Sequence, residues 1–221
     1  MLTRGELTPS RAPRPHLILA SQSPRRRQLL AQHNIAHTAI HPGIDDAELY
    51  PGRVTPAQWV TALAYLKAMA GLYLLRSRGQ TGPLLVLGAD TACVKDGASG
   101  QRLIGTPTSP GEAEVILSTL QDGHHDVVTG VALIRQDSPG LPPGRTLFAD
   151  AARVTVGHIG LARIRAYVES EQWKGKAGGY NLLERIEAGW PMEYEGDPTT
   201  VMGLPMQRLL NVLTRYRHPP A

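Results

Sequence analysis

The chain has 221 residues, 42% of them hydrophobic, which is enough to bury a substantial core in one domain. Its net charge of +4 comes from interspersed acidic and basic residues, so we expect a mild attraction to polyanions and exclude a histone-like composition. The single cysteine, Cys93, excludes an internal disulfide framework and a multi-cysteine metal site, and it fits a reducing compartment such as the cytoplasm. No stretch approaches the roughly 18 consecutive apolar residues of a membrane span, so we expect no membrane partner.

Apolar and amphipathic segments alternate along the chain and predict one α/β domain. Residues 1–15 contain no hydrophobic segment of the kind found in secretory signals, and we expect a flexible tail there, followed by a domain over residues 16–218. Strands are predicted over 16–21, 84–89, 126–135 and 151–157, with weaker candidates near 35–41 and 191–195. Helices are predicted over 24–33, 56–77, 110–121, 159–170 and 205–216, and an exposed turn-rich connection over 137–146.

Two of the predicted helices begin with conventional caps. Thr55 and Ser109 are each followed by a proline, a residue that fits the first helical position. Gln58 and Glu112 stand three residues after these caps, where their side chains can reach back to the cap's amide. Both segments therefore predict complete capping boxes.

The first predicted helix begins differently, because two arginines occupy its first turn. Ser23 is the expected cap, but Arg25 and Arg26 take the second and third helical positions. A cation there typically loses a few tenths to about 1 kcal/mol against the helix dipole. A bound anion would offset this loss, since the helix-start amides, the hydroxyls of Ser21 and Ser23 and two guanidinium groups make a phosphate site. The alternative is that both arginines are solvated.

An aspartate follows the most apolar of the predicted strands. The run Leu84–Leu87 predicts a buried strand, and Asp90 comes soon after it in the segment VLGADTACV. A carboxylate there is costly to bury unless it is paired, hydrogen-bonded or bound to a metal. Asp90 is therefore a candidate to hold Mg²⁺ or to orient a water molecule. The structural alternative is an aspartate that caps a turn with help from Thr91.

Lys67, in the helix predicted over 56–77, is a candidate to contact phosphate. It projects at the margin of a predicted apolar stripe, and the common alternative is that its side chain extends along the surface into solvent. The residues of that stripe are Trp59, Leu63, Leu66, Ala70 and Tyr73.

A glycine-rich segment near the C-terminal third, KGKAGGYNL over 174–182, is a second candidate for binding a nucleotide. Its glycines let the backbone approach a ligand closely, Lys176 can contact phosphate, and Tyr180 is a candidate to pack near a base. A flexible surface loop is the common alternative. The chain has no Walker A sequence and no G-x-G-x-x-G, so the familiar nucleotide fingerprints are absent.

Several longer segments resemble one protein family, the Maf proteins, which are nucleoside triphosphate pyrophosphatases. The order and approximate spacing of that family's motifs are shared by LASQSPRRRQLL, LGADT, GTPTSPGEAEVILSTL, HDVVTGVAL, YVESEQWKGKAGGY and VMGLPM. The resemblance implies a single elongated α/β domain with a mixed central sheet, similar to the inosine triphosphatase fold. It also implies house-cleaning hydrolysis of nucleotides between the α and β phosphates with a divalent metal, Mg²⁺ or Mn²⁺. A homodimer is one assembly that it allows.

The resemblance also carries over candidate site residues. Those implied to bind phosphate are Ser21, Arg25, Arg26, Lys67 and Lys176. Asp90 is implied as the catalytic acidic residue and as a metal ligand, and Asp46 stands where the family usually has a glutamate that binds metal. Whether Asp90 takes a proton from water or only positions the metal stays open.

This chain departs from the family pattern at two positions. Thr106, in GTP, replaces a lysine that binds phosphate, and Leu183 replaces a glutamine at the end of the KAG motif, with Glu184 next to it. The first change removes a cation near the phosphates and the second removes an amide from the site. Lys95 is a candidate to compensate for the lost cation, although a solvent-facing lysine is the simpler interpretation.

The intact SPRRR segment and Lys176 favour the members of the family that act on dTTP and UTP, or on modified pyrimidine nucleotides. Two other functions stay open. One is a regulatory protein, linked to septum formation, that binds nucleotide with little turnover. The other is a basic nucleic-acid-binding module, which is disfavoured because such modules use stacking aromatic residues and aromatics make up only 5% of this chain.

Overall fold

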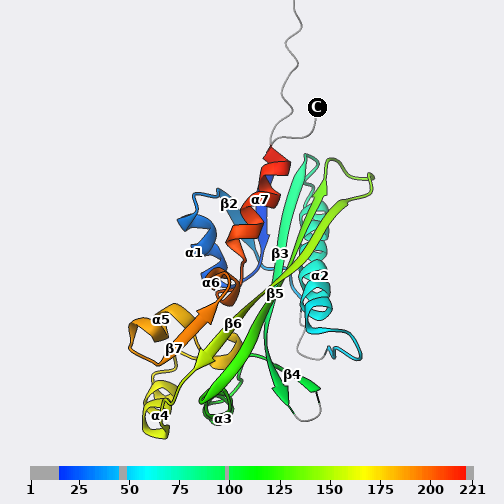
Figure 1. The fold of residues 1–221 in the computed structure, drawn as a ribbon. Helices are drawn as coiled ribbons and strands as arrows, with labels where there is room; N and C mark the ends of the chain where they lie inside the picture. The colour runs from blue at the N-terminus through cyan, green and yellow to red at the C-terminus, as the bar shows by residue number, and fades with distance from the viewer. Residues whose placement is uncertain (1–14, 45–48, 98–99, 218–221) are drawn as a thin grey trace, which may run out of the picture.

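One mixed β-sheet runs through the length of the molecule, as Figure 1 shows for the computed structural model, which describes residues 15–44, 49–97 and 100–217. The strands are β1 (His16–Ala20), β2 (His37–Ile40), β3 (Leu84–Gly97), β4 (Gly100–Ile104), β5 (Gly123–Gln136), β6 (Gly144–Val156) and β7 (Met192–Glu195). The helices are α1 (Pro24–Gln32), α2 (Pro56–Ser77), α3 (Pro110–Leu120), α4 (Leu161–Glu169), α5 (Leu182–Glu187), α6 (Pro198–Val201) and α7 (Met206–Arg217). None of these helices, within the described residues, is long and apolar enough to cross a membrane.

The strands pair in the order β2-β1-β3-β5-β6-β7, and β4 adds to β3 beside this path. β1 is parallel to both β2 and β3, because helices α1 and α2 carry the chain back between these strands. β3, β5, β6 and β7 pair antiparallel. The combination confirms the predicted α/β class with a mixed central sheet.

Two strands, β3 and β6, extend well beyond the ranges that their sequence patterns predict. β3 continues from the predicted end at 89 to Gly97, and its ladder with β5 runs without a break from Leu84 to Val94. β6 begins at Gly144, so the connection predicted over 137–146 is shorter than expected. The pattern missed these extensions because Asp90 and the charged residues of β6 interrupt the apolar runs, whereas the ladder uses only backbone groups. β4, α5 and α6 were not predicted.

The helix caps only partly follow their predictions. Thr55 and Gln58 form the complete capping box at the start of α2. Ser109 caps α3 by accepting from the Glu112 amide, but the Glu112 carboxylate accepts from the amide and hydroxyl of Thr108, not from the cap. The predicted capping box at Ser109 is therefore only half formed, and the predicted hydrogen bond from the cap's amide to the Glu112 carboxylate is wrong. These two hydrogen bonds lower the pKa of the Glu112 carboxyl, because they favour its charged form.

Helix α2 packs against the sheet with a different face from the one its large apolar residues predict. Its buried residues are Val60, Leu63, Ala64, Ala68, Gly71 and Leu72, whereas Leu66 and Tyr73 are exposed. The sheet beneath carries Gly88 on β3 and Gly130 on β5, where a Cβ atom would lie 2.2 Å from the Ala64 carbonyl oxygen and 2.4 Å from the Thr61 nitrogen. The helix backbone thus rests directly on the sheet at these two glycines, and small residues such as Ala64 and Ala68 contribute to the contact beside Leu63 and Leu72.

Two groups of helices cover opposite faces of the upper half of the sheet. Leu29 and Leu30 of α1 and Leu209 of α7 share one buried cluster with Leu19 and Leu87. On the other face, α2 forms a cluster with the remaining residues of β1, β3 and β5. A third cluster joins α3 and α4 to the lower ends of β5 and β6, where Figure 1 shows α3, α4 and α5. The sheet therefore spans two packed regions.

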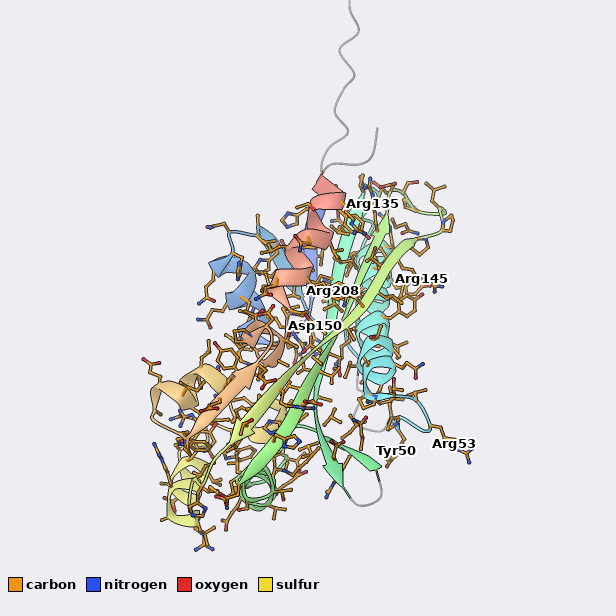
Figure 2. The ribbon with its side chains drawn as sticks, in the orientation of Figure 1. Tyr50, Arg53, Arg135, Arg145, Asp150 and Arg208 are labelled. Atoms are coloured by element: carbon orange, nitrogen blue, oxygen red, sulfur yellow. The ribbon has the colours of Figure 1, made fainter. Side chains whose placement is uncertain are left out.

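Figure 2 labels several arginines on the outside of the molecule. Arg53 lies in the segment before α2 at the lower right, whereas Arg135 and Arg145 lie at the upper end of β5 and β6. Arg208 lies over the Phe148 ring, 4.7 Å from its centroid, and donates to the Ala149 carbonyl oxygen. These arginines are spread along the molecule rather than gathered into one basic stripe.

Candidate active site

A polar cavity of about 190 Å³ opens where α1 begins, beside the middle of β3. Its charged and hydroxyl-bearing lining residues are Ser23, Arg25, Arg26, Lys67, Asp90, Thr91, Thr106 and Tyr180. The segments around 175–180 and 201–203 close its other side. The structure thus brings together residues that are far apart in sequence and that the motifs had named separately.

A larger hollow of about 470 Å³ adjoins this cavity. Ser21, Gln22, His41 and Pro42 line it, and it shares Arg26 and Lys67 among other residues with the first cavity. The two spaces together are large enough for a polyphosphate group and an attached nucleoside.

Arg26 connects three parts of the chain. Its Nε donates to the Gly203 carbonyl oxygen at 3.0 Å, Nη1 donates to Ser21 Oγ at 3.2 Å, and Nη2 donates to Thr91 Oγ1 at 3.1 Å. Acceptors outside α1 therefore stabilise this cation near the helix start. The sequence alone suggested that a bound anion stabilises this cation. The folded chain adds hydrogen-bond acceptors of its own that do the same.

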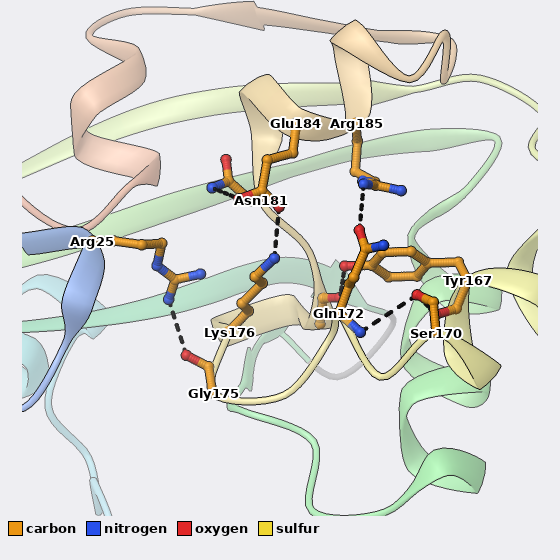
Figure 3. Close-up of polar contacts among 10 residues, drawn as sticks. Arg25, Tyr167, Ser170, Gln172, Gly175, Lys176, Asn181, Glu184 and Arg185 are labelled. Atoms are coloured by element: carbon orange, nitrogen blue, oxygen red, sulfur yellow. Dashed lines mark hydrogen bonds and ion pairs between the residues drawn. The ribbon is translucent and has the colours of Figure 1, made fainter. Parts of the chain in front are cut away.

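Arg25 turns toward the glycine-rich segment, where its Nη2 donates to the Gly175 carbonyl oxygen at 3.0 Å (Figure 3). Burial lowers the pKa of the Arg25 guanidinium, because the charged form loses water contacts. A partly desolvated cation at a helix start is well placed to bind an anion that enters the cavity.

The start of α1 lacks the side-chain cap that the sequence predicts. Ser23 occupies the cap position but makes no capping hydrogen bond, so the prediction for this side chain is wrong. Its amide donates instead to Ser21 Oγ at 3.2 Å. Amides in the first turn of a helix have no acceptor within the helix, so this end of α1 presents donors beside the two arginines.

Lys67 and Asp90 meet at the cavity floor. Lys67 Nζ lies 2.6 Å from Asp90 Oδ1, and the two side chains are only 16% and 14% exposed. Asp90 lies inside β3, opposite Gly130 of β5, and does not follow the strand's end as predicted. The ion pair explains how a carboxylate is tolerated there, because its charge is balanced as it leaves water.

Lys176 does not line the cavity, although its neighbours Gly175 and Ala177 do. Its ammonium lies 2.7 Å from Glu184 Oε2, and Glu184 Oε1 accepts from Asn181 Nδ2 at 2.8 Å. Figure 3 shows Lys176 directed toward Glu184, beside Arg25. The structure therefore places this lysine next to the polar cavity with its charge already paired.

Of the two positions that depart from the family pattern, Thr106 lines the cavity and Leu183 is 41% exposed. Lys95 does not compensate for the missing cation. It does not line the cavity, and its Nζ lies 3.4 Å from the His124 carbonyl oxygen. Asp46, the predicted second metal ligand, lies outside the described residues.

Sequence reasoning missed a hydroxyl network behind Asp90. Thr91 Oγ1 lies 2.9 Å from Thr129 Oγ1, and the Thr129 hydroxyl, completely buried, donates to the Thr200 carbonyl oxygen. With Gly203, these residues link β3, β5 and the α6 segment around Arg26. The segments GADT, VTGV and TVMG contain them, but nothing in the sequence shows that the three segments meet.

Tyr180 is buried and also lines part of the polar cavity, so its contact with a base stays a prediction. Its hydroxyl lies 2.6 Å from His125 Nε2, and the two side chains are 4% and 1% exposed. The backbone at Gly178 packs closely on Cys93 and on the Tyr180 ring, because a Cβ atom there would meet both Cys93 Sγ and that ring. Gly178 therefore allows the 176–180 segment to lie flat on this buried pair.

Stability should fall in mild acid because of His125. Burial lowers the pKa of His125 to about 4, and its Nδ1 has no hydrogen-bond partner among the described residues. The unfolded chain, with an ordinary pKa of 6.5, takes up the proton first, so stabilisation is present above pH 6.5 and is lost as the pH falls toward 4. The loss should reach about 3 kcal/mol.

Urea unfolding of the wild type and of His125→Gln at pH 7 and pH 4.5 measures this effect. The variant should show a smaller difference between the two pH values, whereas His158→Gln, at an exposed histidine, should keep the wild-type difference. An unchanged difference in His125→Gln would show that other groups control acid stability.

The family model for Maf-like proteins matches residues 16–216. The chain belongs to the Maf-like protein family. Curated relatives in this family include dTTP/UTP pyrophosphatases from Pelotomaculum thermopropionicum, 36% identical over 90% of this chain and 96% of the relative, and from Moorella thermoacetica, 39% identical over 90% and 94%.

A third Maf relative, the dTTP/UTP pyrophosphatase of Symbiobacterium thermophilum, is 36% identical over 92% of this chain and 95% of its own. Among solved structures, a nucleoside-triphosphatase, or dITP/XTP pyrophosphatase, from Mycobacterium abscessus covers 64% of this chain and 72% of its own, with 15% identity and a TM-score of 0.32. Structural likeness at this level carries no argument about shared chemistry.

Proposed function

We propose that this Maf protein is a nucleoside triphosphate pyrophosphatase that hydrolyses dTTP and UTP to the nucleoside monophosphate and pyrophosphate. The observation that carries the proposal is the convergence of Arg25, Arg26, Lys67 and Asp90 on one polar cavity at the start of α1. The names of its relatives support the substrate class.

In this proposal the cavity binds the phosphates and the adjoining hollow receives the nucleoside. Arg25, Arg26 and the first-turn amides of α1 neutralise the phosphate oxygens, and Ser21 supplies a hydroxyl beside them. Cations fixed in place before the reaction stabilise the charge that develops on the leaving pyrophosphate. Clamping of this charge therefore contributes more to the rate than proton transfer.

The described residues fit a divalent cation that is shared with the substrate. They contain no group of three or more acidic, histidine or cysteine side chains that would enclose a metal ion. Mg²⁺ usually binds through one or two carboxylates together with substrate phosphates, and Asp90 is the acidic residue among the cavity's described lining. Asp90, with Asp46, would hold Mg²⁺ or Mn²⁺, which supplies Lewis-acid polarisation of phosphate oxygens and water when bound.

Asp90 also lies where a carboxylate can orient the attacking water. Lys67 pairs with Oδ1 at 2.6 Å and so fixes the position of the carboxylate at the cavity. Lys67 can reach a phosphate oxygen of the substrate from this position, since a lysine side chain is long and flexible, and Asp90 would then be left to hold the cation. The pair thus holds both groups ready before the substrate arrives.

The two departures from the family pattern should weaken selectivity. Thr106 offers a hydroxyl in place of a charge at the cavity, and Leu183 offers no polar group to a nucleotide. A site that loses a polar contact to its ligand usually loses discrimination as well. We therefore expect some turnover of modified pyrimidine triphosphates.

A substrate panel tests the proposed function. Purified protein with Mg²⁺ or Mn²⁺ should release pyrophosphate and monophosphate from dTTP and UTP faster than from purine triphosphates or 7-methyl-GTP. Orthophosphate as the first product would contradict the cleavage position, and a preference for 7-methyl-GTP would contradict the substrate class. Saturable nucleotide binding without product release would support the regulatory function instead.

A further inference from the structure

Glu184 forms an ion pair with Lys176, and this carboxylate has no role in the proposed hydrolysis. Lys176 Nζ lies 2.7 Å from Glu184 Oε2, with the lysine side chain 14% exposed and the glutamate side chain 47% exposed. Asn181 Nδ2 donates to the other carboxylate oxygen at 2.8 Å, which fixes the orientation of Glu184 (Figure 3). The lysine is therefore enclosed and the glutamate reaches solvent.

This ion pair lies directly beside the phosphate cavity. The residues on either side of Lys176, Gly175 and Ala177, line the cavity, and the Gly175 carbonyl oxygen accepts from Arg25. Burial lowers the pKa of Arg25, and the negative charge of Glu184 is the largest influence that raises it. One carboxylate thus acts on two cations at the cavity's edge.

We propose that Glu184 sets the affinity for phosphate by competing with a bound phosphate group for Lys176, an inference that rests on the proposed pyrophosphatase function. A phosphate that reaches Lys176 approaches a carboxylate that is already in contact with the same ammonium group. The phosphate and the Glu184 carboxylate are both negatively charged and repel each other, so this repulsion cancels part of the attraction between the phosphate and Lys176. Lys176 can exchange partners because its ammonium has three donors on a flexible stem.

The consequence concerns the product more than the chemical step. Pyrophosphate is highly charged, and a cavity that holds it with several cations releases it slowly. When pyrophosphate leaves, Glu184 takes its place at Lys176 and keeps the lysine from remaining unpaired. Glu184 is therefore a positioning residue that favours product release.

The test measures the dissociation constant of inorganic pyrophosphate by titration calorimetry in a double-mutant cycle. Glu184→Gln should bind pyrophosphate about fivefold more tightly than the wild type, because the competing charge is gone and the side-chain shape is kept. Lys176→Ala should bind more weakly, and Glu184→Gln should have no further effect in that background. In turnover, Glu184→Gln should lower KM for dTTP and strengthen inhibition by pyrophosphate.

Glu187→Gln is the matched control, because Glu187 is exposed on the same helix, α5. This substitution also removes one negative charge, but at a position that does not contact Lys176, so the affinity for pyrophosphate should stay unchanged. Weaker binding in Glu184→Gln would overturn the proposal, since it would mean that Glu184 holds Lys176 in its productive position. An equal gain in the Lys176→Ala background, or in Glu187→Gln, would overturn it in favour of a general effect of net charge.

Pyrophosphate binding also separates this inference from the proposed function. If no triphosphate is hydrolysed but the binding cycle gives the expected pattern, the competition stands and the pyrophosphatase function fails. If dTTP is hydrolysed and Glu184→Gln leaves pyrophosphate affinity unchanged, the function stands and the competition fails.

Discussion

Asp90→Asn should lower kcat/KM for dTTP at least about a hundredfold while the protein stays folded. The amide keeps the size of the side chain but removes the charge, so it can neither hold a divalent cation well nor accept a proton from water. The fold should survive because β3 pairs through its backbone at this position and the Lys67 ammonium can still donate a hydrogen bond to the amide oxygen of asparagine. Steady-state kinetics measures the loss of kcat/KM, and circular dichroism measures whether the protein stays folded.

The matched control is Asp126→Asn. Asp126 is also an ion-paired aspartate on a central strand, bonded to Arg153 Nε at 2.9 Å, but it lies outside the cavity. Its replacement should leave kcat/KM within about twofold, because exposed ion pairs contribute little. Near-normal turnover in Asp90→Asn would remove Asp90 from the mechanism.

Gly88→Ala should destabilise the protein by at least about 3 kcal/mol and lower its activity as well. A Cβ atom at residue 88 would lie 2.2 Å from the Ala64 carbonyl oxygen and 2.7 Å from the Ala68 nitrogen, both in the backbone of α2. A backbone cannot rotate away as a side chain can, so the whole helix must shift. Lys67 lies between these two contacts, and a shifted α2 would draw it away from Asp90.

Gly111→Ala provides the control for Gly88→Ala. Gly111 lies in the first turn of α3, and an added Cβ there would have no atom within 4 Å. This substitution should stabilise the protein slightly, by about 0.5 kcal/mol, because alanine is less flexible in the unfolded chain. Thermal unfolding measures both variants, and a melting temperature in Gly88→Ala close to that of the wild type would show that α2 can relax without cost.

The arginines at the start of α1 show how far local reasoning reaches. Their conflict with the helix dipole is visible in the sequence, and it correctly marked this helix start as unusual. Ser21, an acceptor for Arg26, is only five residues away, but Gly203 and Thr91 lie 177 and 65 residues away along the chain. No local rule gives partners at such separations, so the sequence favoured an anion alone.

Lys176 shows a related limit. The glycines around it predicted a close approach to a ligand, and its neighbours do line the cavity. The direction of its side chain depends on Glu184, whose position follows from the short helix α5 that the sequence did not predict. A helix of one or two turns has too few residues for a periodic pattern and is held by tertiary contacts.

The sequence by itself determined the α/β class, the main strands and helices, and the residue types that would meet a phosphate, because periodicity, caps and charge are local properties. The tertiary structure decided which of these residues meet. Gly88 and Gly130 let α2 lie on the sheet, and this close packing brings Lys67 to Asp90. The face of α2 that is buried therefore depends on the surface beneath it, whereas hydrophobicity along the helix alone correctly included Leu63 but also pointed to Leu66 and Tyr73, which are exposed.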